Sequence, residues 1–236
     1  MIDFVCICDR GLQRPVNQDC AGAFAVPEAG LFFVADGIGG HYAGEKASGL
    51  VSSALEQWWH GCQREKFPSA ADGVLQLRTL LERCNGAIRQ QTPPGARSGT
   101  TIVVLWIREG KYALLSLGDS RCYLTRRKLL RQTSWQLTSD DTVPDNLPNA
   151  GLLERALGAH ARCSVAVRSG PVEPGSLFAL CSDGIYKYCA PTELFRLLGR
   201  ANRTGRLQET GAAIEKVVRA GNAPDNYSLV LVRPQA

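Results

Sequence analysis

Short apolar runs, each bounded by turn-forming residues, recur along the chain and predict β-strands. The run at 31–35 is typical, because Gly30 precedes it and Asp36-Gly37 follows it. Two further runs flank a Glu-Gly pair at 109–110, which is a hairpin signal. We predict strands at residues 2–8, 31–35, 100–107, 112–117, 122–125, 129–132, 163–168, 177–182 and 227–232.

Other segments change to a period of three to four residues, which is the pattern of an amphipathic helix. The clearest are residues 43–60 and 70–91, and the second ends before a Pro-Pro-Gly sequence. Shorter helices are predicted at 191–199 and 206–220, and the polar residues 134–158 are predicted to form a loop. The predicted strands are joined by hairpins, and the predicted helices occur in pairs. This order favours an α+β fold, with antiparallel sheets and helices packed outside.

Composition narrows the class of protein. The chain has 236 residues, of which 44% are hydrophobic and 21% charged, and we interpret residues 1–236 as a single domain. No apolar run approaches the roughly 20 residues of a membrane helix, and no signal peptide is recognisable, so we expect a cytoplasmic protein without a membrane partner. The nine cysteines include no CxxC pair, which predicts reduced thiols packed as small hydrophobic side chains.

The formal net charge of +5 raises the question of nucleic-acid binding. The basic residues are scattered, however, and the one tight run, Arg126-Arg127-Lys128, is predicted to lie in a hairpin turn. A solvated turn explains that run, so no nucleic-acid partner is expected. A mildly basic surface also suits a phosphorylated protein partner.

Aspartates stand beside several of the predicted strands. Asp36, Asp119 and Asp183 each follow an apolar run, Asp225 precedes one, and Asp19 lies near the first strand. Turn chemistry explains any one of them, since Asp-Gly is a common hairpin turn. Five carboxylates at the rim of a core would repel one another, however, and a divalent cation would remove that cost.

The type of ligand indicates the type of metal. Carboxylate and carbonyl oxygens are hard donors, which suit Mg²⁺ or Mn²⁺. The three histidines form no ligand pair, so a histidine-built zinc site is not expected. Gly37 allows close approach of the backbone, and its carbonyl is available as a ligand.

A series of short motifs runs along the chain in a fixed order. The segments are Gly11-x-x-Arg14-x-x-Asn17-Gln18-Asp19, Val34-Ala-Asp36-Gly37-Ile-Gly39-Gly40-His41-x-x-Gly44-Glu-x-Ala47-Ser48, Ser98-Gly-Thr-Thr101, Leu117-Gly118-Asp119-Ser120-Arg121, Gln136-Leu-Thr138-x-Asp140, Arg155-Ala-Leu-Gly158, Ser182-Asp183-Gly184 and Asp225-Asn226. Single motifs are weak evidence, whereas the complete series in order is specific. The series resembles the PPM family, the metal-dependent type 2C protein phosphatases, over nearly the whole chain, and it looks like the compact bacterial branch.

The resemblance implies a four-layer α-β-β-α sandwich with two Mn²⁺ or Mg²⁺ ions in a cleft at one end. It implies hydrolysis of phosphoserine and phosphothreonine on proteins by a hydroxide that bridges the two metals. The implied bridging ligand is Asp36, the implied phosphate clamp is Arg14, and the other implied metal ligands are the Gly37 carbonyl, Asp19, Asp183 and Asp225. The natural counterpart would be a Ser/Thr kinase acting on the same substrates, and we expect a monomer.

The chain departs from the family pattern at two positions. Ile38 stands where eukaryotic members carry a histidine proposed as general acid, so that role is unassigned, and His41 is predicted to cap or pack the next helix. Lys187 stands where many members carry a further aspartate that helps an Asp119-type residue hold a third metal. Our hypothesis is that the Lys187 ammonium pairs with Asp119 and replaces that metal. The predicted loop at 134–158 corresponds to the family's flap, which contacts the substrate protein.

Two other functions compete with catalysis. The first is a non-catalytic phosphoprotein-binding regulatory module on the same fold, which the intact set of aspartates disfavours. The second is a carboxylate–metal nuclease, which the scattered basic residues and the motif order disfavour. The pathway is open, and regulation of a secretion system is one possibility.

Overall fold

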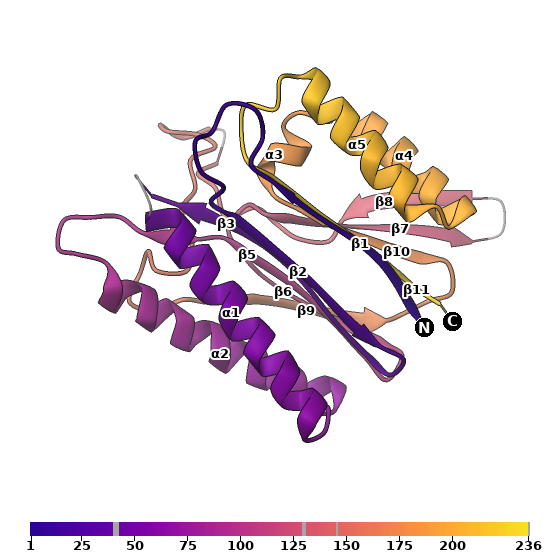
Figure 1. Ribbon diagram of the computed structural model, residues 1–236, viewed down its shortest axis with the longest axis horizontal. Coiled ribbons are helices and arrows are strands. Elements are labelled where there is room, and N and C mark those ends of the chain that lie inside the picture. Colours follow the sequence, from indigo (N-terminus) through magenta and orange to yellow (C-terminus); the bar gives the residue numbers. More distant parts are fainter. Residues whose placement is uncertain (40–42, 129–130, 145, 236) are drawn as a thin grey trace.

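The computed structural model describes residues 1–39, 43–128, 131–144 and 146–235, and these form two β-sheets packed between two pairs of helices (Figure 1). All the strand pairs are antiparallel. The first sheet has the order β1 (Ile2–Asp9), β11 (Tyr227–Pro234), β10 (Ser176–Cys181), β7 (Arg121–Lys128) and β8 (Arg131–Gln136). The second has the order β2 (Asp19–Val26), β3 (Ala29–Ile38), β5 (Ile102–Arg108), β6 (Lys111–Leu117) and β9 (Ala166–Pro171), and β4 (Gly99–Thr100) pairs with β3.

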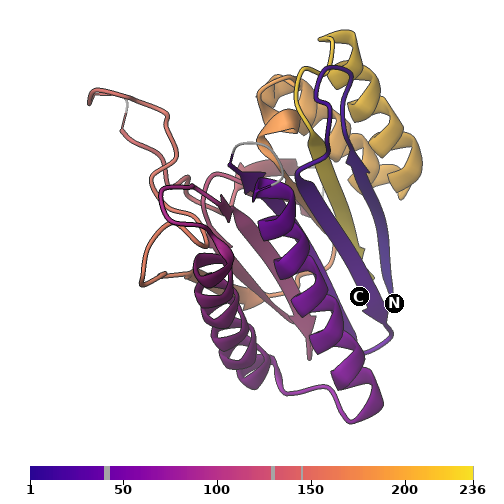
Figure 2. The same ribbon diagram turned by 60° about the vertical axis from the view of Figure 1, so that its left-hand side comes forward.

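The helices cover the outer faces of the sheets. The long helices α1 (Ala43–Arg64) and α2 (Ala70–Gln91) pack on the second sheet, where Trp59 and Trp106 are buried between layers. Helices α4 (Pro191–Thr204) and α5 (Leu207–Ala220) pack on the first sheet, and the short α3 (Asp183–Tyr186) follows β10. The predicted four-layer sandwich is confirmed, as the two views in Figures 1 and 2 show.

A third apolar cluster lies between the two sheets and fixes one against the other. Phe32 and Val34 from β3 contribute to it from one side, and Phe178 and Val230 contribute from the other, all of them fully buried. Full burial of each such side chain stabilises the fold by about 1.5–3 kcal/mol. The sheets are therefore held as a rigid pair, and residues at their ends keep fixed relative positions.

Several strands of this frame differ from the sequence predictions. Strand β2 was not predicted, because its small residues Cys20 to Ala23 give little apolar signal; Gly22 lies against the Phe33 ring of the paired strand. The basic run predicted as a hairpin turn is strand: Arg126 pairs with Thr133, and its guanidinium lies 5.6 Å from the Trp135 ring centroid. The strand predicted at 129–132 begins at Arg131 instead, and residues 129–130 lie outside the described residues.

The cysteines are free thiols, and five of them are buried as small apolar side chains, in agreement with the prediction. Cys6 and Cys8 are exposed instead, because both lie on the edge strand β1 and face away from the helix layer. Within the described residues, no helix combines the length and the apolar character that crossing a membrane demands.

Candidate active site

Five aspartates predicted from the sequence come together at one end of the sandwich, where α3 and the β1–β2 connection also lie (Figure 1). Asp19 opens β2 and Asp36 lies near the end of β3, and the two face each other in register. Asp183 lies two residues after the end of β10, and Asp225 lies two residues before its partner strand β11. Asp119 stands where the chain crosses from β6 in one sheet to β7 in the other. Antiparallel pairing therefore brings ends from distant parts of the sequence to the same edge.

Asp19 ties the two sheets together at this edge. Its carboxylate is 4% exposed and accepts a 2.7 Å hydrogen bond from the Ser182 hydroxyl. The same hydroxyl oxygen accepts a 2.9 Å bond from the backbone N–H of Ser228 on β11. Ser182 thus fixes Asp19 relative to the segment that carries Asp183.

Hydrogen bonds to the backbone N–H and carbonyl of Asp36 hold this residue in place, so its carboxylate is not needed for positioning and is available as a metal ligand. Its N–H donates to the Thr101 hydroxyl at 3.0 Å, and its carbonyl accepts from the Thr100 hydroxyl at 3.0 Å and from the Thr101 N–H at 2.8 Å. At Gly37 a side chain would collide with the Gly44 carbonyl at the start of α1. Only glycine therefore lets the β3 backbone approach the helix so closely.

The Asp183 and Asp225 segments are packed against each other through a second glycine. A Cβ on Gly184 would collide with the Asn226 carbonyl, so the α3 turn lies directly on the chain entering β11. Asn226 is 5% exposed and its amide donates to the carbonyls of Arg10 and Val16 at 2.8 and 3.0 Å. The oxygen of its side-chain amide accepts a hydrogen bond from the Gln18 backbone N–H at 2.9 Å. Asn226 therefore fixes the loop that carries Arg14.

Two positively charged side chains form ion pairs with two of the carboxylates. Arg14 donates to Asp225 at 2.9 Å, which places this exposed arginine at the site, as the sequence predicted. Lys187 donates to Asp183 at 2.6 Å. Lys187 caps α3 one helical turn after Asp183 and forms its ion pair with that carboxylate, so the predicted ion pair with Asp119 is not formed. The Lys187 charge still lowers the pKa of Asp119, against the raising effects of burial and Asp183.

Asp119 is held by a tyrosine instead. The Tyr186 hydroxyl donates to the Asp119 carboxylate at 3.2 Å, and the Arg121 guanidinium lies 3.6 Å from the centre of the Tyr186 ring. Arg121 in turn makes a two-pronged bond to Asp140, with distances of 3.1 and 2.6 Å. This stack joins α3 to the start of the β8–β9 connection, residues 137–165.

The electrostatics show how close the carboxylates are to one another. Burial raises the pKa of Asp36 well above its usual range, and the charges of Asp19, Asp183, Asp119 and Asp225 raise it further. Burial, followed by the charges of Asp183 and Asp225, raises the pKa of Asp19 to about 7, against the lowering effect of the hydrogen bond from Ser182. Burial and the Asp183 charge likewise raise the pKa of Asp119. The closely spaced carboxylates therefore favour the binding of cations, which would offset their mutual repulsion.

The donor set fits divalent cations that prefer oxygen ligands. Among the described residues, no three Asp, Glu, His or Cys side chains converge as a closed chelating group, since Asp19, Asp183 and Asp225 are turned to Ser182, Lys187 and Arg14. Arg14 and Lys187 are both about half exposed, so solvent can take over their charges when a metal arrives. The raised pKa of Asp36 shows that its ionisation is unfavourable in this site, and a bound divalent cation would remove that penalty.

The comparison with protein families decides between the readings of this site. Residues 13–218 match the family model for protein phosphatase 2C. The chain belongs to the protein phosphatase 2C family. The resemblance seen in the ordered motifs is thereby confirmed.

Similar proteins with the same family fold come from several bacteria. The serine/threonine phosphatase stp of Listeria monocytogenes is 27% identical over 244 aligned residues, covering 95% of this chain and 92% of the relative. The solved structure of PppA, a regulatory component of T6SS in Pseudomonas aeruginosa, has a TM-score of 0.82 at 29% identity, covering 98% and 97% of the two chains. The PstP catalytic domain in complex with two manganese ions has a TM-score of 0.78 at 25% identity, covering 100% and 99%.

Sequence reasoning found the carboxylates and missed the residues that position them. Ser182, Asn226 and Tyr186 were not assigned roles, although the first two lie inside the quoted motifs, beside Asp183 and Asp225. Polar residues next to candidate ligands are the signal that could have found them. The predicted role of His41 lies outside the described residues.

Proposed function

We propose that this chain hydrolyses phosphoserine and phosphothreonine esters on proteins in a metal-dependent reaction, as a single phosphatase domain over residues 1–236. The observation that carries the proposal is the gathering of five carboxylates at one end of the sandwich, with an arginine at their edge. Membership of the protein phosphatase 2C family and the names of the relatives support the same reaction.

The proposed metal ligands are Asp36, the Gly37 carbonyl, Asp19, Asp183 and Asp225. Two divalent ions bound there, Mn²⁺ or Mg²⁺, would supply Lewis-acid activation of the attacking water and of the phosphate. The two manganese ions in the PstP structure support this number for a relative. Ser182 and the Thr100-Thr101 pair would keep Asp19 and Asp36 in position throughout the reaction.

Arg14 is the proposed phosphate-binding residue. Its planar guanidinium can bind two phosphate oxygens at once, and Asp225 holds it beside the cluster in the structure. Ile38, which is 37% exposed, occupies the place of the histidine that is proposed as general acid in eukaryotic members of the family. We therefore propose that a water molecule, and no side chain, protonates the leaving serine or threonine oxygen.

The physiological setting is a further proposal. A Ser/Thr kinase that phosphorylates the same proteins would be the natural counterpart, and the likeness to PppA keeps secretion-system regulation among the possible pathways. The predictions of a cytoplasmic location and of a monomer stay predictions.

Hydrolysis of para-nitrophenyl phosphate and of a phosphothreonine peptide, each with and without Mn²⁺, tests the proposal. We expect both substrates to be hydrolysed only with metal, and we expect Asp36→Asn to abolish both activities. A non-catalytic module would bind the peptide and release no phosphate. Equal activity of the wild type and Asp36→Asn would sink the catalytic reading, and cleavage of DNA or RNA by wild type but not Asp36→Asn would favour the nuclease.

A further inference from the structure

A cavity of about 570 Å³ opens beside the candidate active site, and the mechanism does not use it. It lies between the segment that follows α2 and the β8–β9 connection, and Ile38 forms part of its lining. Ile38 is two residues from Asp36 on β3, a rise of about 7 Å along a strand. A peptide bound at the carboxylates therefore reaches this cavity within two or three residues.

The charge of the cavity is strongly biased. Its lining includes Arg89, Arg97, Arg155 and His160, with Glu154 as the one acidic residue among the described residues that line it. Arg155 is already paired with Asp141. Arg89 and Arg97 are exposed, and neither guanidinium has an ion-pair partner in the described part of the chain. Two arginines are thus available to an anionic group from outside.

The cavity walls are tied together by hydrogen bonds. Asn85 of α2 is 3% exposed; its carbonyl oxygen accepts from the Gly158 N–H at 2.7 Å, and its amide donates to the His160 carbonyl at 3.1 Å. Thr100 and Leu157 exchange two backbone bonds of 3.0 and 2.9 Å. Because Thr100 also binds the Asp36 carbonyl, the cavity and the carboxylate cluster are built on the same piece of backbone.

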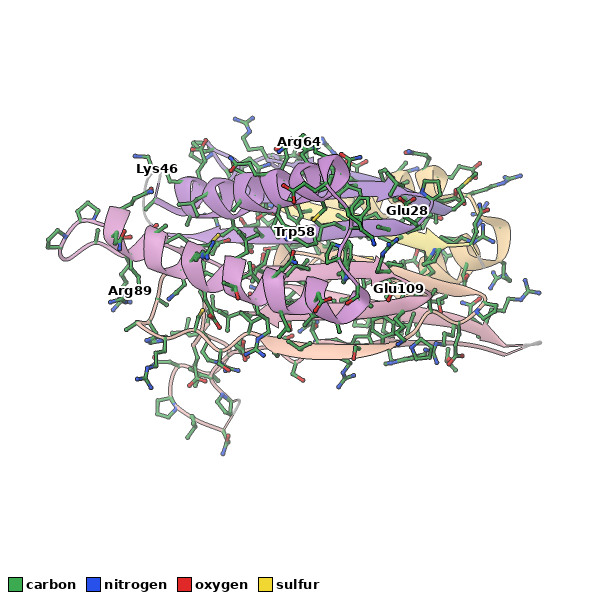
Figure 3. The ribbon with its side chains drawn as sticks, turned by 90° about the horizontal axis from the view of Figure 1, so that it is seen from below. Glu28, Lys46, Trp58, Arg64, Arg89 and Glu109 are labelled. Atoms are coloured by element: carbon green, nitrogen blue, oxygen red, sulfur yellow. The ribbon has the colours of Figure 1, made fainter. Side chains whose placement is uncertain are left out.

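Figures 2 and 3 show the same arrangement from outside. In Figure 2 the β8–β9 connection lies beside the upper end of α2 and projects from the body of the molecule. In Figure 3 Arg89 lies at the end of α2 on the side of that connection, whereas Arg64 lies toward the other end of the helix pair. Arg89 therefore lies at the end of the helix pair that a substrate protein would approach.

We propose that this cavity is a second anion-binding subsite, which selects phosphopeptides carrying an additional acidic group two or three residues from the hydrolysed phosphate. Arg89 and Arg97 are its specificity-determining residues. The additional group is a carboxylate or a second phosphate, since both offer the paired oxygens that a guanidinium fork binds. The proposal rests on the proposed phosphatase function and names its substrate class.

The test compares phosphate release from four groups of phosphothreonine peptides by the 236-residue chain with Mn²⁺. One peptide is neutral around the phosphothreonine, and the others place a Glu, a Gln or a second phosphothreonine two or three residues to either side. We expect kcat/KM about 10-fold higher for an acidic peptide than for its Gln partner, with the difference in KM, because two exposed ion pairs supply about 1.4 kcal/mol. The Glu and second-phosphate arms identify which anion the subsite prefers.

The double variant R89Q/R97Q should reduce the ratio of acidic to neutral peptide to about twofold or less. The matched control R64Q/R78Q removes the same charge from exposed positions on α1 and α2 that do not line the cavity, and it should keep the ratio of the wild type. The preference of the wild type should also weaken as salt is raised.

Two outcomes would overturn the subsite: equal kcat/KM for acidic and Gln peptides in the wild type, or an equal loss of preference in both double variants, which would mean a diffuse charge effect. Neither outcome touches the proposed function, as long as the neutral peptide is hydrolysed. Failure to hydrolyse any peptide or para-nitrophenyl phosphate with Mn²⁺ would instead overturn the phosphatase function itself.

Discussion

Asp19 is a buried carboxylate whose ionisation the fold opposes, and this makes a measurable prediction for the metal-free protein. Burial first, and then the charges of Asp183 and Asp225, raise the pKa of Asp19 from the ordinary 3.8 to about 7. Asparagine has the same shape and can still accept the bond from Ser182. The variant Asp19→Asn should therefore remove a repulsion without removing the contact.

The sign and size follow from linkage between ionisation and folding. Because the folded pKa is the higher one, the folded protein keeps the proton while the unfolded chain loses it, and stability falls as pH rises from 3.8 to about 7. Ionisation then costs about 4 kcal/mol at pH 8 and about 2 kcal/mol at pH 5.5. For a chain of this size these costs correspond to a Tm about 8 °C lower at pH 8 and about 4 °C lower at pH 5.5.

Thermal unfolding in EDTA at the two pH values, followed by circular dichroism, measures the effect. Asp19→Asn should melt above the wild type, with the larger difference at pH 8. The control Asp3→Asn changes a carboxylate at the end of β1 that lies away from the aspartate cluster. The Asp3 side chain is 37% exposed, and its carboxylate lies 3.9 Å from the Arg233 guanidinium, so this variant should change Tm by about 2 °C or less at both pH values.

Adding Mn²⁺ should reverse the order of the two proteins at pH 8. The wild type gains the binding energy of a metal held by Asp19, and the variant loses that ligand. The reasoning is refuted if metal-free Asp19→Asn melts below the wild type at pH 8, since the carboxylate would then stabilise the fold as an anion.

Three further variants examine the other polar groups of the site. Arg14→Ala should raise KM for para-nitrophenyl phosphate and lower kcat/KM by about 10- to 100-fold, because charge-assisted hydrogen bonds to the phosphate are lost. Arg14→Lys should give intermediate values, since lysine keeps the charge and loses the planar fork. Unchanged steady-state kinetics in both variants would exclude Arg14 as the phosphate clamp. Lys187→Met should tighten Mn²⁺ binding by about two- to fivefold, because a half-exposed ion pair to Asp183 no longer competes, and weaker binding by calorimetry would contradict this role. Gly37→Ala should lower Tm and Mn²⁺ affinity together, because the new methyl group collides with the Gly44 carbonyl; an unchanged Tm would show that the close approach of β3 and α1 is dispensable.

A carboxylate cluster could be suspected from the sequence because Asp36, Asp119, Asp183 and Asp225 each stand beside a strong apolar run, although turn chemistry explains any one of them. The assignment of Asp36, Asp183 and Asp225 to one metal site rests on the ordered motifs and the family resemblance that they carry, and the antiparallel pairing explains why these strand ends meet at one edge. The two-layered sheet and its paired helices followed from the same runs and from the resemblance to a known family.

The remainder depends on tertiary contacts that leave little trace in a single sequence. Strand β2 owes its conformation to pairing with β3, since its small residues have weak strand preference of their own. Helix α3 is one turn long and gives no periodic signal. The partner of Lys187 depended on that turn, because the helical spacing from Asp183 exists only once α3 has formed.

The central claim is that Asp19, Asp36, Asp183 and Asp225 bind divalent metal ions, with Asp36 as the shared ligand. Calorimetric titration of Mn²⁺ into the metal-free chain, beside the same titration of Asp36→Asn, tests it most directly. The account predicts two ions for the wild type and the loss of tight binding in the variant, together with the loss of para-nitrophenyl phosphate hydrolysis. Two ions bound with wild-type affinity by Asp36→Asn would contradict it.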